Sequence, residues 1–255
     1  MTETTTKTTT KTTNSFDRLA IPLIIVGAVL TTTAFVLAFT LAPLVMGAAV
    51  DPPALIGGKM VANKLLLSQK IFYFHMPVAV TSFVALLFTA IYGVLFLVKR
   101  ERHYDLNAKV ATEVALVFIL MTMVSGELWT RYEWGVWWVW EPRLTTYFIL
   151  MLLIIGYFIL RGAIDDAERR ATYASVFGII AFIDVPICFL ITRMVPSSVH
   201  PVIFRTDSGL PPPMLIPLLI ALFGMFCIAF GLYRTRLREQ RLRERLAALK
   251  ESLED

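Results

Sequence analysis

Hydrophobic residues along this chain are gathered into six long runs separated by shorter polar stretches. About 20 apolar residues in helical conformation are needed to cross the hydrocarbon core of a bilayer. Irregular backbone cannot face lipid at that depth, so helices are the expected spanning elements. The pattern therefore predicts an all-α fold, a polytopic membrane bundle of six transmembrane helices within residues 19–233. The six runs, of which the third and fourth are short, cover residues 19–41, 71–98, 110–125, 144–160, 171–194 and 214–233.

Polar segments flank the predicted bundle on both sides. Residues 1–18 are rich in threonine and are predicted to form a disordered cytoplasmic tail. The first apolar run is longer than the h-region of a cleavable signal peptide, so none is expected. Residues 234–255 form a charged tail in which leucines recur on one helical face. This tail fits a coiled coil or a docking helix, although a solvated basic helix beside anionic headgroups is favoured. The leucines are Leu242, Leu246, Leu249 and Leu253.

Composition and charge agree with a membrane protein and orient it. The chain is 57% hydrophobic and only 17% charged, a balance that few soluble domains of this length have. Seventeen of the 24 lysines and arginines fall in the two tails and in the connections on the same side of the bundle. The positive-inside rule then predicts cytoplasmic termini (N-in/C-in) in a multi-pass membrane protein. The basic residues are topology signals and do not indicate nucleic-acid binding.

All five tryptophans lie in one short stretch, from Trp129 to Trp140, between the third and fourth apolar runs. The charge count places this stretch on the outer side. Trp134, Trp137, Trp138 and Glu141 follow the spacing i, i+3, i+4, i+7, which predicts a short interfacial helix with all four on one face. Pro142 is expected to end or kink that helix. Such a concentration of aromatic surface suits a large planar ligand; an aromatic belt that anchors the connection at the headgroups is the alternative.

The three histidines supply candidate ligands for a metal. His75 lies at the outer end of the second run and His200 in the connection before the sixth, both on the side of the tryptophans, whereas His103 is in a cytoplasmic connection. Two imidazoles can hold haem iron from opposite faces, and a nearby arginine can pair with the propionates. Arg143 is the main candidate for that pairing; Arg131 and Arg205 are weaker ones. Zinc would need four ligands, and the sequence shows no such cluster. A histidine with only a structural hydrogen bond is the alternative for either position.

Asp184 and the cysteines are the other polar or reactive groups inside the apolar runs. Asp184 either has a function in the membrane or only satisfies local polar groups near Pro186, which frees a backbone carbonyl, and the two interpretations are equally supported. Cys188 and Cys227 are expected to be small buried side chains. The chain has no Cys-x-x-Cys-His motif and is therefore not itself a c-type cytochrome.

Residues 134–145, Trp-Gly-Val-Trp-Trp-Val-Trp-Glu-Pro-Arg-Leu-Thr, resemble the tryptophan-rich "WWD" signature of the haem-handling proteins of cytochrome c biogenesis. The six-helix size, the flanking histidines and the segment 184–187 resemble the CcmC branch of this group, the haem exporter protein C family. The likeness extends over residues 71–233. Two positions depart from the family pattern: Glu141-Pro142 stands where an aspartate and a small residue are usual, and the context of His200 differs.

The resemblance implies a haem b site built from two axial histidines and the tryptophan-rich loop, residues 129–145. The axial ligands of the iron would be His75 and His200. The residues of the loop that would contact haem are Trp134, Gly135, Trp137, Trp138, Trp140, Glu141 and Arg143.

Members of this family lie in the bacterial cytoplasmic (inner) membrane, present haem on its outer face and pass it to the haem chaperone CcmE. The small membrane protein CcmD and the ABC transporter CcmAB complete the family's complex. The resemblance thus implies a haem-delivery protein and not an enzyme. One alternative is a haem–apocytochrome c ligase of the related WWD branch, which carries a further histidine pair in the membrane that this chain lacks. The other is a transmembrane haem exporter, for whose path only Asp184 is available.

Overall fold

The structure is a computed structural model of the chain and describes residues 18–43, 54–56, 59–61, 70–195 and 210–254. Each of the six helices in these ranges is long and apolar enough to cross a membrane. The predicted all-α bundle of six spans is therefore confirmed. The helices are α2 (Ala20–Thr40), α3 (Phe72–Lys99), α4 (Arg102–Trp134), α5 (Pro142–Ala163), α6 (Ala167–Met194) and α7 (Pro212–Glu254).

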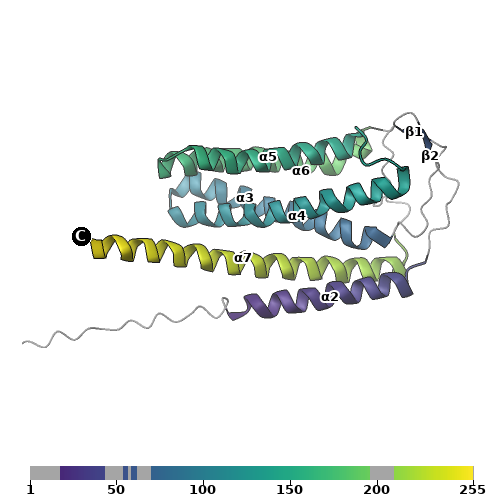
Figure 1. Cartoon of the computed structure of the whole chain (residues 1–255), viewed down its shortest axis with the longest axis horizontal. Coiled ribbons are helices and arrows are strands. Elements are labelled where there is room, and N and C mark those ends of the chain that lie inside the picture. Colours follow the sequence, from purple (N-terminus) through teal and green to yellow (C-terminus); the bar gives the residue numbers. More distant parts are fainter. Residues whose placement is uncertain (1–17, 44–53, 57–58, 62–69, 196–209, 255) are drawn as a thin grey trace, which may run out of the picture.

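The helices stack in three pairs (Figure 1). α5 lies against α6, α3 against α4, and α2 against α7, with α3 also packed on α6 and α7. The start of α2 and the end of α7 lie at one end of the bundle, and the connection from α4 to α5 lies at the other. We call these the termini end and the tryptophan end.

Two helices, α4 and α7, are much longer than their apolar runs. α4 begins at Arg102 and continues to Trp134, so part of the tryptophan-rich stretch is helical. α7 continues without a break from its apolar half through the charged tail to Glu254 and extends past the other helices at the termini end (Figure 1). Helix-forming residues carry both helices beyond the apolar zone, which hydrophobicity alone cannot predict. An unpredicted antiparallel hairpin, β1 (Ala54–Ile56) and β2 (Lys59–Val61), lies between α2 and α3.

Small residues let α2 and α7 approach closely. The buried residues of α2 are Ala20, Gly27, Ala34 and Ala38, and most of its larger side chains are exposed on the surface that would face lipid. A Cβ added at Gly27 would lie 2.6 Å from the backbone oxygen of Gly224, and one added at Gly224 would lie 2.6 Å from Thr31 Oγ1. Close backbone approach at small residues is how helices associate where no water drives them together.

Buried hydroxyls tie the middle helices together. Ser82 Oγ on α3 is 2.8 Å from Tyr147 Oη on α5, and Thr89 Oγ1 is 3.1 Å from Thr112 Oγ1 on α4. Around them lies an apolar core whose fully buried members include Leu86, Ile119 and Leu150. This scaffold fixes α3 and α4 relative to each other, and both carry residues of the site described next.

Candidate functional site

His75 lies in the first turn of α3 and contacts α4 through three residues. Its Nδ1 is 2.9 Å from Ser125 Oγ. Its ring meets the ring of Trp129 edge to face, with the centroids 6.0 Å apart. A Cβ added at Gly126 would lie 3.1 Å from His75 Cε1, so a glycine at this position gives the imidazole room. Ser125 and Trp129 are one helical turn apart and hold the histidine from the same face of α4.

The hydrogen bonds of Ser125 indicate which nitrogen of His75 carries the proton. Ser125 Oγ donates to the backbone oxygens of Met121, at 2.8 Å, and Thr122, at 3.1 Å. Since the single hydroxyl proton is directed there, Ser125 accepts from Nδ1–H of His75. In that tautomer Nε2 holds the lone pair, which is the form of imidazole that binds a metal.

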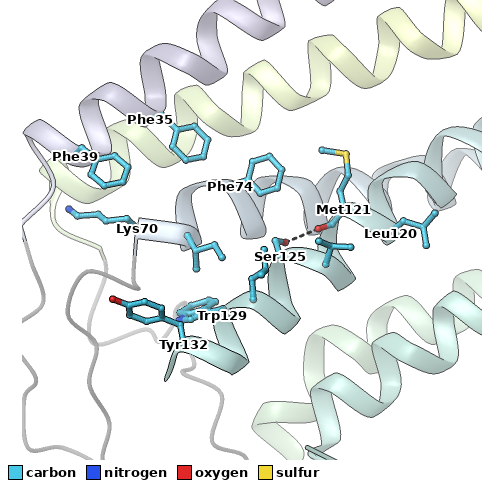
Figure 2. Close-up of a pocket in the computed structure, with 12 residues that line it drawn as sticks. Phe35, Phe39, Lys70, Phe74, Leu120, Met121, Ser125, Trp129 and Tyr132 are labelled. Carbon is cyan, nitrogen blue, oxygen red and sulfur yellow. Dashed lines mark hydrogen bonds between the residues drawn. The ribbon is translucent and has the colours of Figure 1, made fainter. Parts of the chain in front are cut away.

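An apolar cavity of about 800 Å³ lies beside Ser125 and Trp129 (Figure 2). Ser125 and Trp129, both in contact with His75, also line the cavity. Its volume is within the roughly 300–1,000 Å³ of small-molecule and cofactor sites. The cavity is bounded by α2, α3 and α4, and its other lining residues are Phe35, Phe39, Lys70, Ile71, Phe74, Leu120, Met121, Val124, Leu128 and Tyr132.

Lys70 is the one charged residue of this lining, and it connects α3 to the end of α2. Its Nζ donates to the backbone oxygens of Ala38, at 2.7 Å, and Ala42, at 2.6 Å. These carbonyls belong to the last turn of α2 and the residues after it, where no intrahelical donor remains. Burial lowers the pKa of the Lys70 amine below its usual value, and the residue is only 5% exposed. Lys70 therefore fixes one wall of the cavity.

The tryptophan-rich stretch does not form the predicted interfacial helix, and that prediction is wrong. Gly135 has φ of 72°, a left-handed conformation that ends α4 at Trp134. Residues 135–141 are non-helical, so Trp134, Trp137, Trp138 and Glu141 do not share one helical face. The predicted loop 129–145 is thus a seven-residue connection between two helices. Helical spacing alone could not reveal this, because the glycine allows the backbone to leave the helix.

Glu141 and Pro142 begin the next helix. Glu141 is the N-cap of α5: its Oε1 accepts from the backbone N–H of Leu144 at 2.8 Å, and the side chain is only 8% exposed. Pro142 is the first helical residue, where its missing N–H costs nothing. The expectation that Pro142 ends or kinks a helix is therefore wrong. The Glu-Pro pair at this position is explained by the start of α5, where Glu141 is the N-cap and Pro142 the first helical residue.

The tryptophans of the connection divide into two groups. Trp138, Trp140 and Phe148 pack edge to face, with ring centroids 5.4 to 6.2 Å apart. The guanidinium of Arg131 lies over the ring of Trp137, 5.7 Å from its centroid, and donates to the backbone oxygen of Gly135. Trp137 is 57% exposed and Trp140 is 74% exposed. Two broad aromatic surfaces at this end of the bundle are thus open to a ligand, a lipid or a partner.

The other predicted site residues are placed as follows. Arg143 is in the first turn of α5, close enough to interact electrostatically with Glu141 and Cys188. The Cys188 thiol donates to Asp184 Oδ2, one helical turn away, at 3.4 Å. This local contact favours the interpretation of Asp184 as a residue with a structural partner. His200 and Arg205 lie outside the described residues.

The sequence did not single out Ser125, Gly126 or the pairing of Trp129 with His75. The signal present was the i, i+4 spacing of Ser125 and Trp129, which gains meaning only when α3 is known to pack on that face. The structure brings His75 together with Trp129, and Trp138 together with Trp140. It does not gather the whole set of tryptophans into one platform.

Comparisons with known proteins identify the family of this chain. A family model described as CcmC, "Heme exporter protein C", matches residues 4–252. A "Heme exporter protein C" of Bradyrhizobium diazoefficiens is 32% identical over 185 residues, which cover 71% of this chain and 69% of the relative. Proteins of the same name from Paracoccus denitrificans and Escherichia coli (strain K12) are 27% identical over 183 residues and 28% identical over 171 residues. These alignments cover 71% and 67% of this chain, and 76% and 69% of the relatives. Because the family model matches nearly the whole chain, the protein belongs to the CcmC, haem exporter protein C, family.

Proposed function

We propose that this protein handles haem for cytochrome c maturation: it binds haem b at the tryptophan end of the bundle and delivers it to the haem chaperone CcmE. Family membership and the names of the relatives support the class of cargo. The observation that carries the proposal is the position of His75: its Nδ1 is hydrogen-bonded to Ser125, its ring packs on Trp129, and both of these residues line an apolar cavity.

The described residues fit haem in chemistry and in size. A neutral imidazole with a fixed orientation is a common axial ligand of haem iron, and the hydrogen bond to its other nitrogen strengthens that ligand. The apolar, partly aromatic lining of the cavity excludes water and suits a porphyrin ring. Iron and porphyrin supply the reactivity of the cargo, whereas the protein supplies binding and orientation.

In this proposal His200 is the second axial ligand and Arg143 pairs with a propionate. The loop contacts come from Trp134, Gly135, Trp137, Trp138, Trp140 and Glu141. The exposed rings of Trp137 and Trp140 are where the chaperone docks. Aromatic residues of this kind are enriched at protein–protein interfaces.

The positive-inside rule supports the outer face of the cytoplasmic membrane as the position of this site, since 17 of the 24 lysines and arginines of the sequence fall in the two tails and the connections on the other side of the bundle. CcmD and the transporter CcmAB are the proposed membrane partners. The role proposed for this chain is delivery of haem, which the exporter name of its family and relatives supports.

The test is covalent loading of the chaperone in cells that depend on this protein for it. We expect His75→Ala to abolish haem-dependent peroxidase staining of CcmE, with the variant still present in the membrane at normal abundance. His103→Ala is the matched control, because His103 is exposed at the opposite end of the bundle, and it should leave staining unchanged. Full staining with His75→Ala would refute the role proposed for this histidine.

A further inference from the structure

A second pocket lies at the termini end of the bundle, remote from His75. It has a volume of about 700 Å³ and opens where the turns α3–α4 and α5–α6 come together. Residues of α7 close it on the remaining side, since Gln240 and Glu244 belong to its lining. Five helices thus build one cavity at the level where α3 and α5 end.

The pocket is amphipathic. Its apolar wall includes the side chains of Phe96, Leu106 and Phe158, from the ends of the spans. Its polar wall carries five basic residues and three acidic ones. The basic residues are Arg100, Arg102, Lys109, Arg161 and Arg170, and the acidic ones are Asp105, Glu168 and Glu244.

Internal ion pairs account for only part of the positive charge. Arg161 is paired with Asp105 through two contacts of 2.6 and 2.9 Å, and both side chains are largely buried. Arg102 and Glu244 approach to 3.6 Å, but both are well exposed, so their pairing is weak.

Arg100 and Arg170 have only neutral acceptors in the part of the chain that the structure describes. Arg100 Nη1 donates to Thr172 Oγ1 at 2.8 Å. Arg170 Nη1 donates to the backbone oxygens of Ile164 and Asp165, at 3.2 and 3.3 Å. Each guanidinium has five donors, so most of their capacity and all of their charge remain for a ligand.

We propose that this pocket binds the phosphate of an anionic phospholipid. Arg100 and Arg170 hold the phosphate, and the acyl chains follow Phe96 and Phe158 toward the bilayer. Basic pockets between transmembrane helices on the cytoplasmic side are suited to anionic headgroups. A soluble phosphate compound would use the basic wall but would have no use for the apolar one, and this favours a lipid.

The test is native mass spectrometry of the full-length protein titrated in detergent with phosphatidylglycerol or with phosphatidylcholine. We expect the wild type to bind phosphatidylglycerol at least tenfold more tightly. Replacing both arginines, R100Q/R170Q, should weaken phosphatidylglycerol binding about 30-fold, the usual effect of two basic residues at an anionic surface. Binding of phosphatidylcholine should not change.

The matched control is R169Q/R245Q, which removes the same charge from exposed positions that do not line the pocket. It should leave the lipid preference intact, and excess inorganic phosphate should not displace the lipid. Equal binding of the two lipids, an equal loss in both double variants, or displacement by phosphate would each overturn the proposal. Should R100Q/R170Q not fold, R100K/R170K keeps both charges and should keep the preference; a folded lysine variant without it would also overturn the proposal.

Discussion

At the scale of single residues, the proposed function depends on how α4 holds the imidazole of His75. Ser125 accepts from Nδ1–H, Gly126 leaves room for the ring, and Trp129 packs edge to face with it. A ligand whose rotamer and tautomer are already fixed loses little entropy when iron binds. Groups that orient a metal-binding histidine in this way commonly raise its affinity for the metal.

Replacing Ser125 tests this arrangement. We expect Ser125→Ala to lower haem affinity by about 10- to 100-fold, the usual effect of removing the group that orients a histidine ligand. The measurement is haem titration of the purified protein, followed by its optical spectrum. Ser175→Ala is the control, because Ser175 is also a buried serine, on α6, whose hydroxyl has no hydrogen-bond partner among the described residues. Equal affinities in the two variants would count against the orienting role.

Glu141 is a second residue with a defined structural role, as the N-cap of α5. Its carboxylate caps α5, so Glu141→Ala should lower the free energy of unfolding by about 1 kcal/mol, the usual effect of losing an N-cap side chain. Glu141→Asp keeps a carboxylate at the cap and should recover most of that stability. Denaturant unfolding in micelles, followed by helical circular dichroism, measures both. If the alanine variant were as stable as the wild type, the cap would not stabilise α5.

At the scale of elements, the helices have different kinds of boundary. α4 ends at a left-handed glycine, α5 begins at a carboxylate and a proline, and α2 is attached to α7 through small residues. Two of these devices shorten the tryptophan-rich connection, so the exposed rings of Trp137 and Trp140 are held on a short segment between rigid helices. This limits the positions that the rings can adopt.

The close contact of α2 with α7 at Gly27 and Gly224 predicts which substitutions would separate the two helices. Gly224→Leu should separate α2 from α7, because even a Cβ at Gly224 would lie 3.0 Å from the backbone oxygen of Gly27 and nearer still to Thr31. We expect a lower melting temperature and faster proteolysis at the α2 end. Gly162→Leu is the matched control, since a Cβ there meets no atom within 4 Å. Identical melting of the two variants would show that the close approach is not required.

The sequence predicts the helices well where hydrophobic composition determines them. It predicts them poorly where the backbone conformation of a single residue determines where a helix ends. Six apolar runs suffice for six spans, but the left-handed turn at Gly135 overrides the helical spacing of the tryptophans. His75 could be singled out as a candidate ligand from its position and chemistry. Its partner Ser125 could not, because the two are 50 residues apart and meet only through the packing of α3 on α4.

At the scale of the whole molecule, the bundle has chemically different ends. The tryptophan end carries His75, an apolar cavity and exposed aromatic rings. The termini end carries the ion pair of Arg161 with Asp105, that of Arg236 with Glu113, and the basic pocket. This asymmetry is what a membrane protein needs if one end binds and presents a cargo while the other interacts with the cytoplasmic leaflet.

In the proposed function, His75 and His200 bind haem iron together at the tryptophan end. The most direct measurement is the optical and electron paramagnetic resonance spectrum of the purified full-length protein loaded with haem. We predict a low-spin bis-imidazole signature that His75→Ala and His200→Ala each remove and that His103→Ala leaves unchanged. A spectrum that is the same in the wild type and in both ligand variants would contradict the claim.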